Sequence, residues 1–148
     1  MTEETLWQRA IELAKKAELT CAPNPMVGAV IVKGGKIIGE GYHQVAGCDH
    51  AEIRAIKDAK KKGHDLKGAT IYVTLEPCST YGRTPPCTKA IIENKFAAVK
   101  IGTIDPNPKH AGRAVKILTD AGIKVTVADR SDCKELNEVF NARLSSIR

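Results

Sequence analysis

Residues 69–103 read ATIYVTLEPCSTYGRTPPCTKAIIENKFAAVKIGT, and this stretch decides the fold. A run rich in apolar and β-branched residues over 69–75 stops abruptly at Pro77 and predicts a buried strand. Two adjacent prolines then suit the start of a helix to about Asn94, because the first turn of a helix needs no amide donor. A second buried-type strand is predicted over 97–103. Strand, helix and strand in this order predict a parallel β-α-β unit.

Apolar spacing, and glycine or proline at element ends, predict further elements on both sides of this unit. In chain order they are a helix over 4–19, a Gly-Gly hairpin of strands 27–33 and 36–42, a helix over 50–62, a helix around 114–121, a strand over 123–128 and a last amphipathic helix around 136–144. Alternating strands and helices predict a sheet covered on both faces, and the hairpin adds an antiparallel edge. We therefore expect an α/β fold, a three-layer α/β/α sandwich with a mixed five-stranded sheet.

Length and composition indicate one globular domain. A chain of 148 residues can bury a full core, and 43% apolar with 27% charged residues is ordinary for a soluble protein. The N-terminus lacks a signal-peptide pattern, and no apolar run approaches the roughly 18 residues of a membrane span. We expect a cytoplasmic protein with no membrane partner.

The net charge and the cysteine content limit the binding partners and the cysteine roles that we expect. The net charge is +6, but aromatic residues make up only 4%, so there is little on which exposed bases could stack. Nucleic acid is therefore not an expected partner. Five unevenly spaced cysteines do not form a disulfide framework. Of these, Cys21, Cys48 and Cys133 belong to no ligand-like cluster and are expected to be buried free thiols.

Three residues at predicted strand–helix junctions form a candidate zinc site. His50 opens a helix, Cys78 follows a strand end and Cys87 begins the next helix. One imidazole and two thiolates suit zinc, and three protein ligands leave the fourth position open, which is typical of catalytic sites. Glu52, two residues after His50, is placed to move protons. The order His-x-Glu, Pro-Cys and a second cysteine is the zinc deaminase signature. The alternative is a structural zinc site, in which Cys48 or His43 would supply a fourth ligand.

The run TLEPCSTYGRTPPC over 74–87 closely resembles the pyrimidine deaminase of riboflavin biosynthesis. This diaminohydroxyphosphoribosylaminopyrimidine deaminase family belongs to the cytidine deaminase-like superfamily. Further matching motifs span most of the chain: NPMVG at 24–28, GEGYH at 39–43, HAE at 50–52, DPNP at 105–108, AGR at 111–113 and LNE at 136–138. The long gap between the two cysteines distinguishes this family from nucleoside and transfer-RNA deaminases.

The resemblance implies a reaction, a cofactor and a set of contacts. With zinc as cofactor, the family hydrolyses the 2-amino group of 2,5-diamino-6-ribosylamino-4(3H)-pyrimidinone 5′-phosphate to give 5-amino-6-(5-phosphoribosylamino)uracil and ammonia. By position, the implied substrate contacts are Asn24, His43, Thr80, Arg83, Asp105 and Asn107. Where this chain has Thr80, the family usually has histidine, and threonine cannot carry charge. For His43 the alternative is a packed strand-end histidine, and for the Asp-Pro-Asn-Pro loop it is turn chemistry.

The resemblance also bears on domains and partners. The bacterial enzyme often continues into an NADPH-dependent reductase domain, whereas residues 1–148 are expected to form a single deaminase domain without it. We expect a homo-oligomer, a dimer or tetramer, with a functional link to a separate or detached reductase. The alternative functions are a related zinc deaminase that acts on a nucleotide or a transfer-RNA adenosine, and a non-catalytic zinc-stabilised binding module.

Overall fold

The computed structural model describes residues 1–18, 20–21, 24–80, 85–136 and 138. Its elements, in order, are α1 (Glu3–Lys15), β1 (Gly28–Lys33), β2 (Lys36–Tyr42), α2 (Ala51–Lys61), β3 (Thr70–Val73), α3 (Cys87–Glu93), β4 (Ala98–Ile101), α4 (Arg113–Asp120) and β5 (Lys124–Val127). Residues 131–136 are also helical, and most of the predicted last helix lies outside the described residues. The predicted order is confirmed, with most elements shorter than expected.

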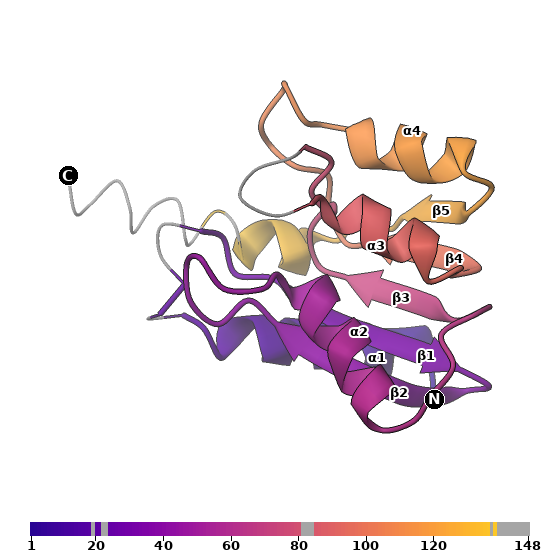
Figure 1. Cartoon of the computed structure of the whole chain (residues 1–148). Coiled ribbons are helices and arrows are strands. Elements are labelled where there is room, and N and C mark those ends of the chain that lie inside the picture. Colours follow the sequence, from indigo (N-terminus) through magenta and orange to yellow (C-terminus); the bar gives the residue numbers. More distant parts are fainter. Residues whose placement is uncertain (19, 22–23, 81–84, 137, 139–148) are drawn as a thin grey trace.

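The five strands form one mixed sheet in the order β2-β1-β3-β4-β5 (Figure 1). β1 is antiparallel to both β2 and β3, and Ile31 lies opposite Ile71 across the β1–β3 pair. β3, β4 and β5 are parallel, with Val73 opposite Ile101 and then Val127. The carboxyl ends of β3 and β4 therefore lie at the same edge of the sheet, where loops carry functional residues in such folds.

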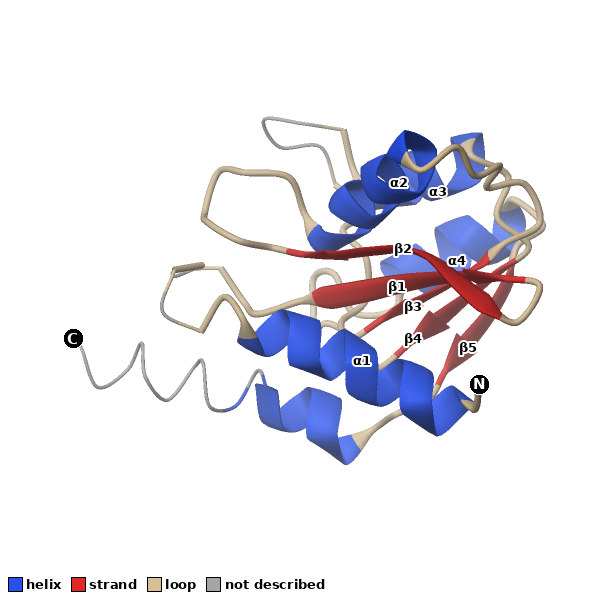
Figure 2. Cartoon of the chain, turned by 90° about the horizontal axis from the view of Figure 1, so that it is seen from below, coloured by secondary structure: helices blue, strands red, loops and turns tan. Residues whose placement is uncertain are grey.

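Helices cover both faces of the sheet and complete the expected α/β/α sandwich. Figure 2 shows α1 on one face and α2, α3 and α4 on the other. Alternate side chains of each strand point to opposite faces. Val30 and Tyr72 pack with α1, whereas Ile31 and Ile71 pack in the larger core beneath α2, α3 and α4. A strand between two apolar layers needs apolar residues on both sides, which explains the unbroken apolar runs in the sequence.

Glycine allows α2 to lie unusually close to the sheet. A Cβ atom on Gly39 would come within 2.5 Å of the Ala55 carbonyl oxygen, and one on Gly41 within 2.6 Å of the Ala55 amide nitrogen. Because these approaches are too short for any side chain, β2 must carry glycine where α2 crosses it. This close packing fixes the first turn of α2, where His50 and Glu52 lie.

Two expectations need correction. The helix predicted over 4–19 ends at Lys15, because the following turn uses tighter bonds, such as the one from the Ala17 amide to the Ala14 carbonyl oxygen. Cys48 is exposed rather than buried, because it lies in the irregular segment between β2 and α2; Cys21 and Cys133 are buried as predicted. In the described part of the chain, no helix is long and apolar enough to cross a membrane.

Candidate metal centre and active site

Three elements bring the predicted zinc ligands together. His50 is the N-cap of α2, Cys78 follows β3, and Cys87 is the first residue of α3. One ligand atom of each lies within 4.8 Å of the others, and among the described residues no fourth histidine, cysteine or acidic residue belongs to the group. A closed structural site would need that fourth ligand, so the geometry favours an open, catalytic type of site.

Contacts within the triad show which atoms point toward one another and could bind a metal ion. Nδ1 of His50 lies 3.3 Å from Sγ of Cys87 and 3.5 Å from Sγ of Cys78. The Cys87 backbone amide donates to Sγ of Cys78 at 3.0 Å. Hydrogen bonding from the Cys87 thiol lowers the pKa of Cys78 to about 4 and raises that of Cys87 itself. One imidazole nitrogen and two sulfur atoms, one of them readily ionised, fit zinc.

Glu52 lies beside this triad in the first turn of α2. Its side chain is buried, with only 3% of the residue exposed. Burial is the main cause that raises its pKa to about 7, and the negative charge of Cys78 adds to it. A carboxyl group with a pKa near neutrality can both accept and donate a proton at the pH of a cell. Glu52 therefore has the properties of a general acid and base.

Two neighbouring hollows lie at the triad, and Asn24, His50 and Cys78 line both of them. The inner one, of about 250 Å³, is also lined by Glu52, His43 and Asp105. The outer one, of about 890 Å³, extends past Thr80 and Lys89. An inner cavity of this size suits a single ring, while the outer hollow leaves room for the remainder of a larger ligand.

His43 is held as a neutral ring. Nδ2 of Asn24 donates to Nε2 of His43 over 2.9 Å, so Nδ1 carries the proton and donates to the Asp49 carbonyl oxygen at 3.2 Å. Burial is the main cause that lowers its pKa. His43 is thus a packed histidine at the end of a strand, and it also lines the inner cavity. Both predicted roles, a packed histidine and a substrate contact, are compatible with this position.

The other predicted contacts are spread along the hollows. Thr80 is exposed and lines the outer hollow, and Asp105 lines the inner cavity. Asn107 is exposed, and its backbone amide donates to Oδ1 of Asp105 at 2.9 Å, which is turn chemistry. Arg83 lies outside the described residues.

Glu76 is a functional candidate that the sequence reading missed. Its carboxylate is buried at the end of β3 and accepts hydrogen bonds from three backbone amides of the 105–114 segment. The available signal was an acidic residue directly between a buried strand and the Pro-Cys pair. The sequence pattern indicates only that the strand ends here, because the partners of Glu76 lie far along the chain.

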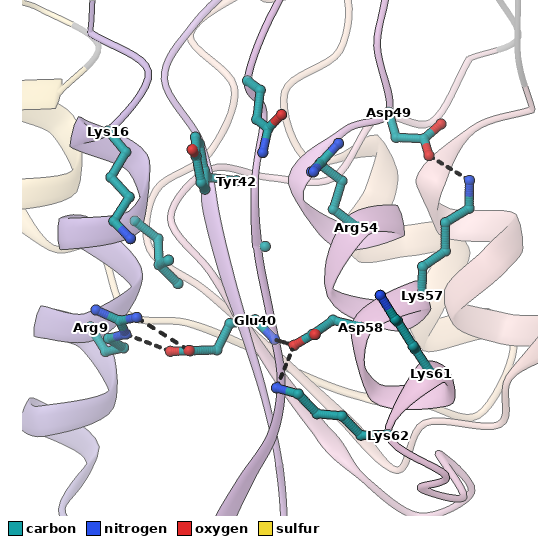
Figure 3. Close-up of a pocket in the computed structure, with 13 residues that line it drawn as sticks. Arg9, Lys16, Glu40, Tyr42, Asp49, Arg54, Lys57, Asp58, Lys61 and Lys62 are labelled. Carbon is teal, nitrogen blue, oxygen red and sulfur yellow. Dashed lines mark hydrogen bonds and ion pairs between the residues drawn. The ribbon is translucent and has the colours of Figure 1, made fainter.

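A separate groove of about 480 Å³ lies on the outer side of β2, between α1 and α2 (Figure 3). None of the triad residues lines it. Its acidic residues pair with cations: Glu40 with Arg9, Asp58 with Lys62, and Asp49 with Lys57. The groove therefore carries paired charges along the edge strand β2, and among the described residues it shares only Asp49 with the hollows at the triad.

A mixed α/β/α sandwich with one histidine and two cysteines at helix starts, and a buried glutamate beside them, defines the class of zinc-dependent deaminases. Residues 1–103, which include the triad and Glu52, match the family described as the cytidine and deoxycytidylate deaminase zinc-binding region. The chain belongs to this family, its cofactor is zinc, and the triad is positioned to bind a metal ion.

Curated relatives align along almost the whole chain. It is 47% identical to the riboflavin biosynthesis protein RibD of Synechocystis over 100% of this chain and 40% of the relative. The chloroplastic riboflavin biosynthesis protein PYRD of Arabidopsis thaliana is 50% identical over 93% of this chain and 32% of its own length. The chain thus spans well under half the length of these relatives.

Solved structures agree with the fold. A Thermotoga maritima diaminohydroxyphosphoribosylaminopyrimidine deaminase/5-amino-6-(5-phosphoribosylamino)uracil reductase superposes with a TM-score of 0.89 and 50% identity, covering 98% of this chain and 42% of that one. The Rib2 deaminase of Aspergillus oryzae has a TM-score of 0.72 at 21% identity over 94% of this chain and 98% of its own, which supports the fold alone. The expected cytidine deaminase-like fold is confirmed.

Proposed function

We propose that the chain hydrolyses the 2-amino group of 2,5-diamino-6-ribosylamino-4(3H)-pyrimidinone 5′-phosphate, releasing ammonia and 5-amino-6-(5-phosphoribosylamino)uracil, an early step of riboflavin biosynthesis. The observation that carries this proposal is the 50% identity, over 98% of the chain, to a structure named for that deaminase. The geometry of the triad, with an open side toward a ring-sized cavity, supports it.

Glu52 is the proton carrier in this reaction. When bound by the triad, zinc acts as a Lewis acid that makes water reactive at neutral pH. Glu52 takes one proton from the attacking water and gives it to the ring nitrogen, and it then takes the second proton from the hydroxyl group now on the carbon and gives it to the departing amino group. One C–O bond forms, one C–N bond breaks, and ammonia leaves. A pKa of about 7 suits a carboxyl group that must pass a proton in both directions.

The remaining side chains orient the substrate. The inner cavity takes the pyrimidine ring, and the outer hollow takes the ribose and phosphate. Asn24 uses its amide N–H on His43, so its side-chain oxygen is left to accept from the ring. Asp105 at the inner cavity and Thr80 in the outer hollow offer further hydrogen bonds, and Arg83 is assigned to the phosphate because its planar fork matches it.

Residues 1–148 are assigned the deamination alone, as a single domain. The Thermotoga maritima protein is also named as a reductase, and this chain covers 42% of it. We therefore place the NADPH-dependent reduction in a reductase outside these residues, whether on a separate chain or attached. A cytoplasmic location and a homo-oligomeric state complete the proposal, and light scattering of the purified chain tests the latter.

Ammonia release tests the proposal directly. The zinc-loaded chain should release one ammonia per ribotide and none from cytidine or adenosine nucleotides. Activity on a nucleotide or on transfer RNA instead would identify a different deaminase, and in the RNA case binding should weaken steeply with salt.

Cys78→Ser and Cys87→Ser variants should lose both zinc and activity. Cys133→Ser, at a buried cysteine that packs with α1 and lines neither hollow, is the matched control that should keep both.

A further inference from the structure

The Glu76 carboxylate joins the end of β3 to a loop far along the chain. Its Oε1 atom accepts from the Asp105 amide at 3.1 Å and from the Gly112 amide at 3.0 Å. Its Oε2 atom accepts from the Ala114 amide at 2.9 Å. The Glu76 backbone amide also donates to the Thr103 carbonyl oxygen at 2.9 Å. One residue thus fixes the loop after β4 at its start and at its end.

A carboxylate is required at this position for a physical reason. Gly112 is the N-cap of α4 and has no side chain that could satisfy the free amides of the first turn. Among the described residues, no cation forms a salt bridge with Glu76, and only 6% of the residue is exposed. Its charge is therefore balanced by amide dipoles and the positive end of α4. Two acceptor oxygens are needed because donors approach from both sides.

The hydrogen bonds of Glu76 affect the position of a residue in the candidate active site. Glu76 is two residues from the ligand Cys78, and both Glu76 and Asp105, whose amide it holds, line the inner cavity together with Glu52. The position of Asp105 relative to the metal ligands is thus set by a side chain that was not among the predicted contacts. We propose that Glu76 is a positioning residue, which holds the 105–112 loop so that Asp105 faces the substrate ring. This inference rests on the proposed deaminase function.

The Glu76→Gln variant tests the proposal with almost no change in size. A glutamine carbonyl oxygen can accept from one side only, and its NH₂ group would face backbone donors on the other. We expect KM for the ribotide to rise roughly tenfold or more, because Asp105 is displaced, while kcat changes little and one zinc per chain is retained. Hydrogen exchange at the Asp105, Gly112 and Ala114 amides should accelerate.

The matched control is Asp58→Asn. Asp58 also accepts a backbone amide, that of Glu40 at 2.9 Å, but does so in the groove outside β2. This variant should lose stability and keep the wild-type KM. If Glu76→Gln also lost stability without a change in KM, Glu76 would be only a helix cap and the proposal would be wrong.

Two further measurements keep the test decisive. If Glu76→Gln does not fold, Glu76→Asp retains the carboxylate on a shorter side chain, and an unchanged KM in that folded variant would overturn the proposal. A double variant with Asp105→Ala should have the same KM as Asp105→Ala alone, because Glu76 acts through Asp105. If the wild type releases no ammonia from the ribotide, the proposed function fails, whereas exchange in Glu76→Gln that is faster only at the 105–114 amides would still show that Glu76 holds this loop.

Discussion

Carboxylates are used in opposite ways at the two sides of this protein. Beside the metal ligands, Glu52 and Glu76 are buried, and no salt bridge with a cation is found for either within the described residues. In the groove outside β2, Glu40 and Asp58 are partly exposed and pair with Arg9 and Lys62 (Figure 3). A buried carboxyl group without a cation can have a raised pKa, as Glu52 does, or it can be held by several backbone amides, as Glu76 is. Charged side chains along an edge strand are a common means of preventing it from pairing with another sheet.

The largest effect is expected on kcat, when the buried Glu52 beside the triad is replaced. Glu52→Gln keeps the size of the side chain but removes the group that carries protons, so kcat should fall by roughly 10²–10⁴-fold or more. Zinc content should stay at the wild-type value, because Glu52 is not part of the ligand group. Ammonia-release kinetics with metal analysis check this, and activity within a few-fold of wild type would refute the assigned role.

The same variant should change the pH dependence of stability in metal-free protein. The pKa of Glu52 is raised to about 7, mainly by burial, so the folded state holds a proton that the unfolded state releases near pH 4.5. Stability of the wild type therefore falls as pH rises from about 4.5 to 7, by about 3 kcal/mol in total. Metal-free Glu52→Gln lacks this loss, so it should be the more stable protein at pH 8 and similar at pH 5. Urea unfolding after chelation measures it, and parallel pH curves would contradict it.

Asp58 should contribute a pH dependence of stability that is opposite to that of Glu52. Burial opposes its ionisation, but the hydrogen bond from the Glu40 amide and the ion pair with Lys62 lower its pKa overall. Its stabilisation is present above pH ~4 and is lost as pH falls through the lowered pKa of the folded state. Asp58→Asn should cost about 1 kcal/mol at pH 7 and progressively less below pH 4. Thermal unfolding across this range checks the prediction, which a constant difference would exclude.

The smallest effect is expected for the ion pair of Arg9 with Glu40. Arg9→Met keeps much of the apolar stem and removes the charge, so unfolding should change by no more than about 1 kcal/mol. The difference should shrink in about 1 M salt, which screens partly exposed charges. A large, salt-independent loss would mean that this pair supports the core rather than the surface of the sheet.

Local patterns carried much of the fold and of the metal site. Strand and helix order followed from residue periodicity, because a strand buried on both faces needs a continuous apolar run and a surface helix needs an apolar stripe. His50, Cys78 and Cys87 could be recognised because each stands at a junction between predicted elements, and those junctions converge at one edge of the mixed sheet. Element ends were less well predicted, as α1 shows, since tertiary contacts and turn bonds decide where a helix stops.

Only the tertiary structure decided which hydrogen-bond partners the side chains near the triad have. The amides bound by Glu76 are 29 to 38 residues away in sequence, so no local pattern could reveal its part in the 105–112 loop. His43 is a neutral ring because Asn24, 19 residues earlier, donates to it. Hydrogen bonds of this kind depend on the path of loops through space, whereas periodicity records only burial. The sequence by itself predicted the zinc ligands, Glu52 as the proton carrier and the order of the elements along the chain. The packed chain decided the order of the strands in the sheet and the hydrogen bonds by which Glu76 holds the 105–112 loop, because both depend on contacts between residues far apart in sequence.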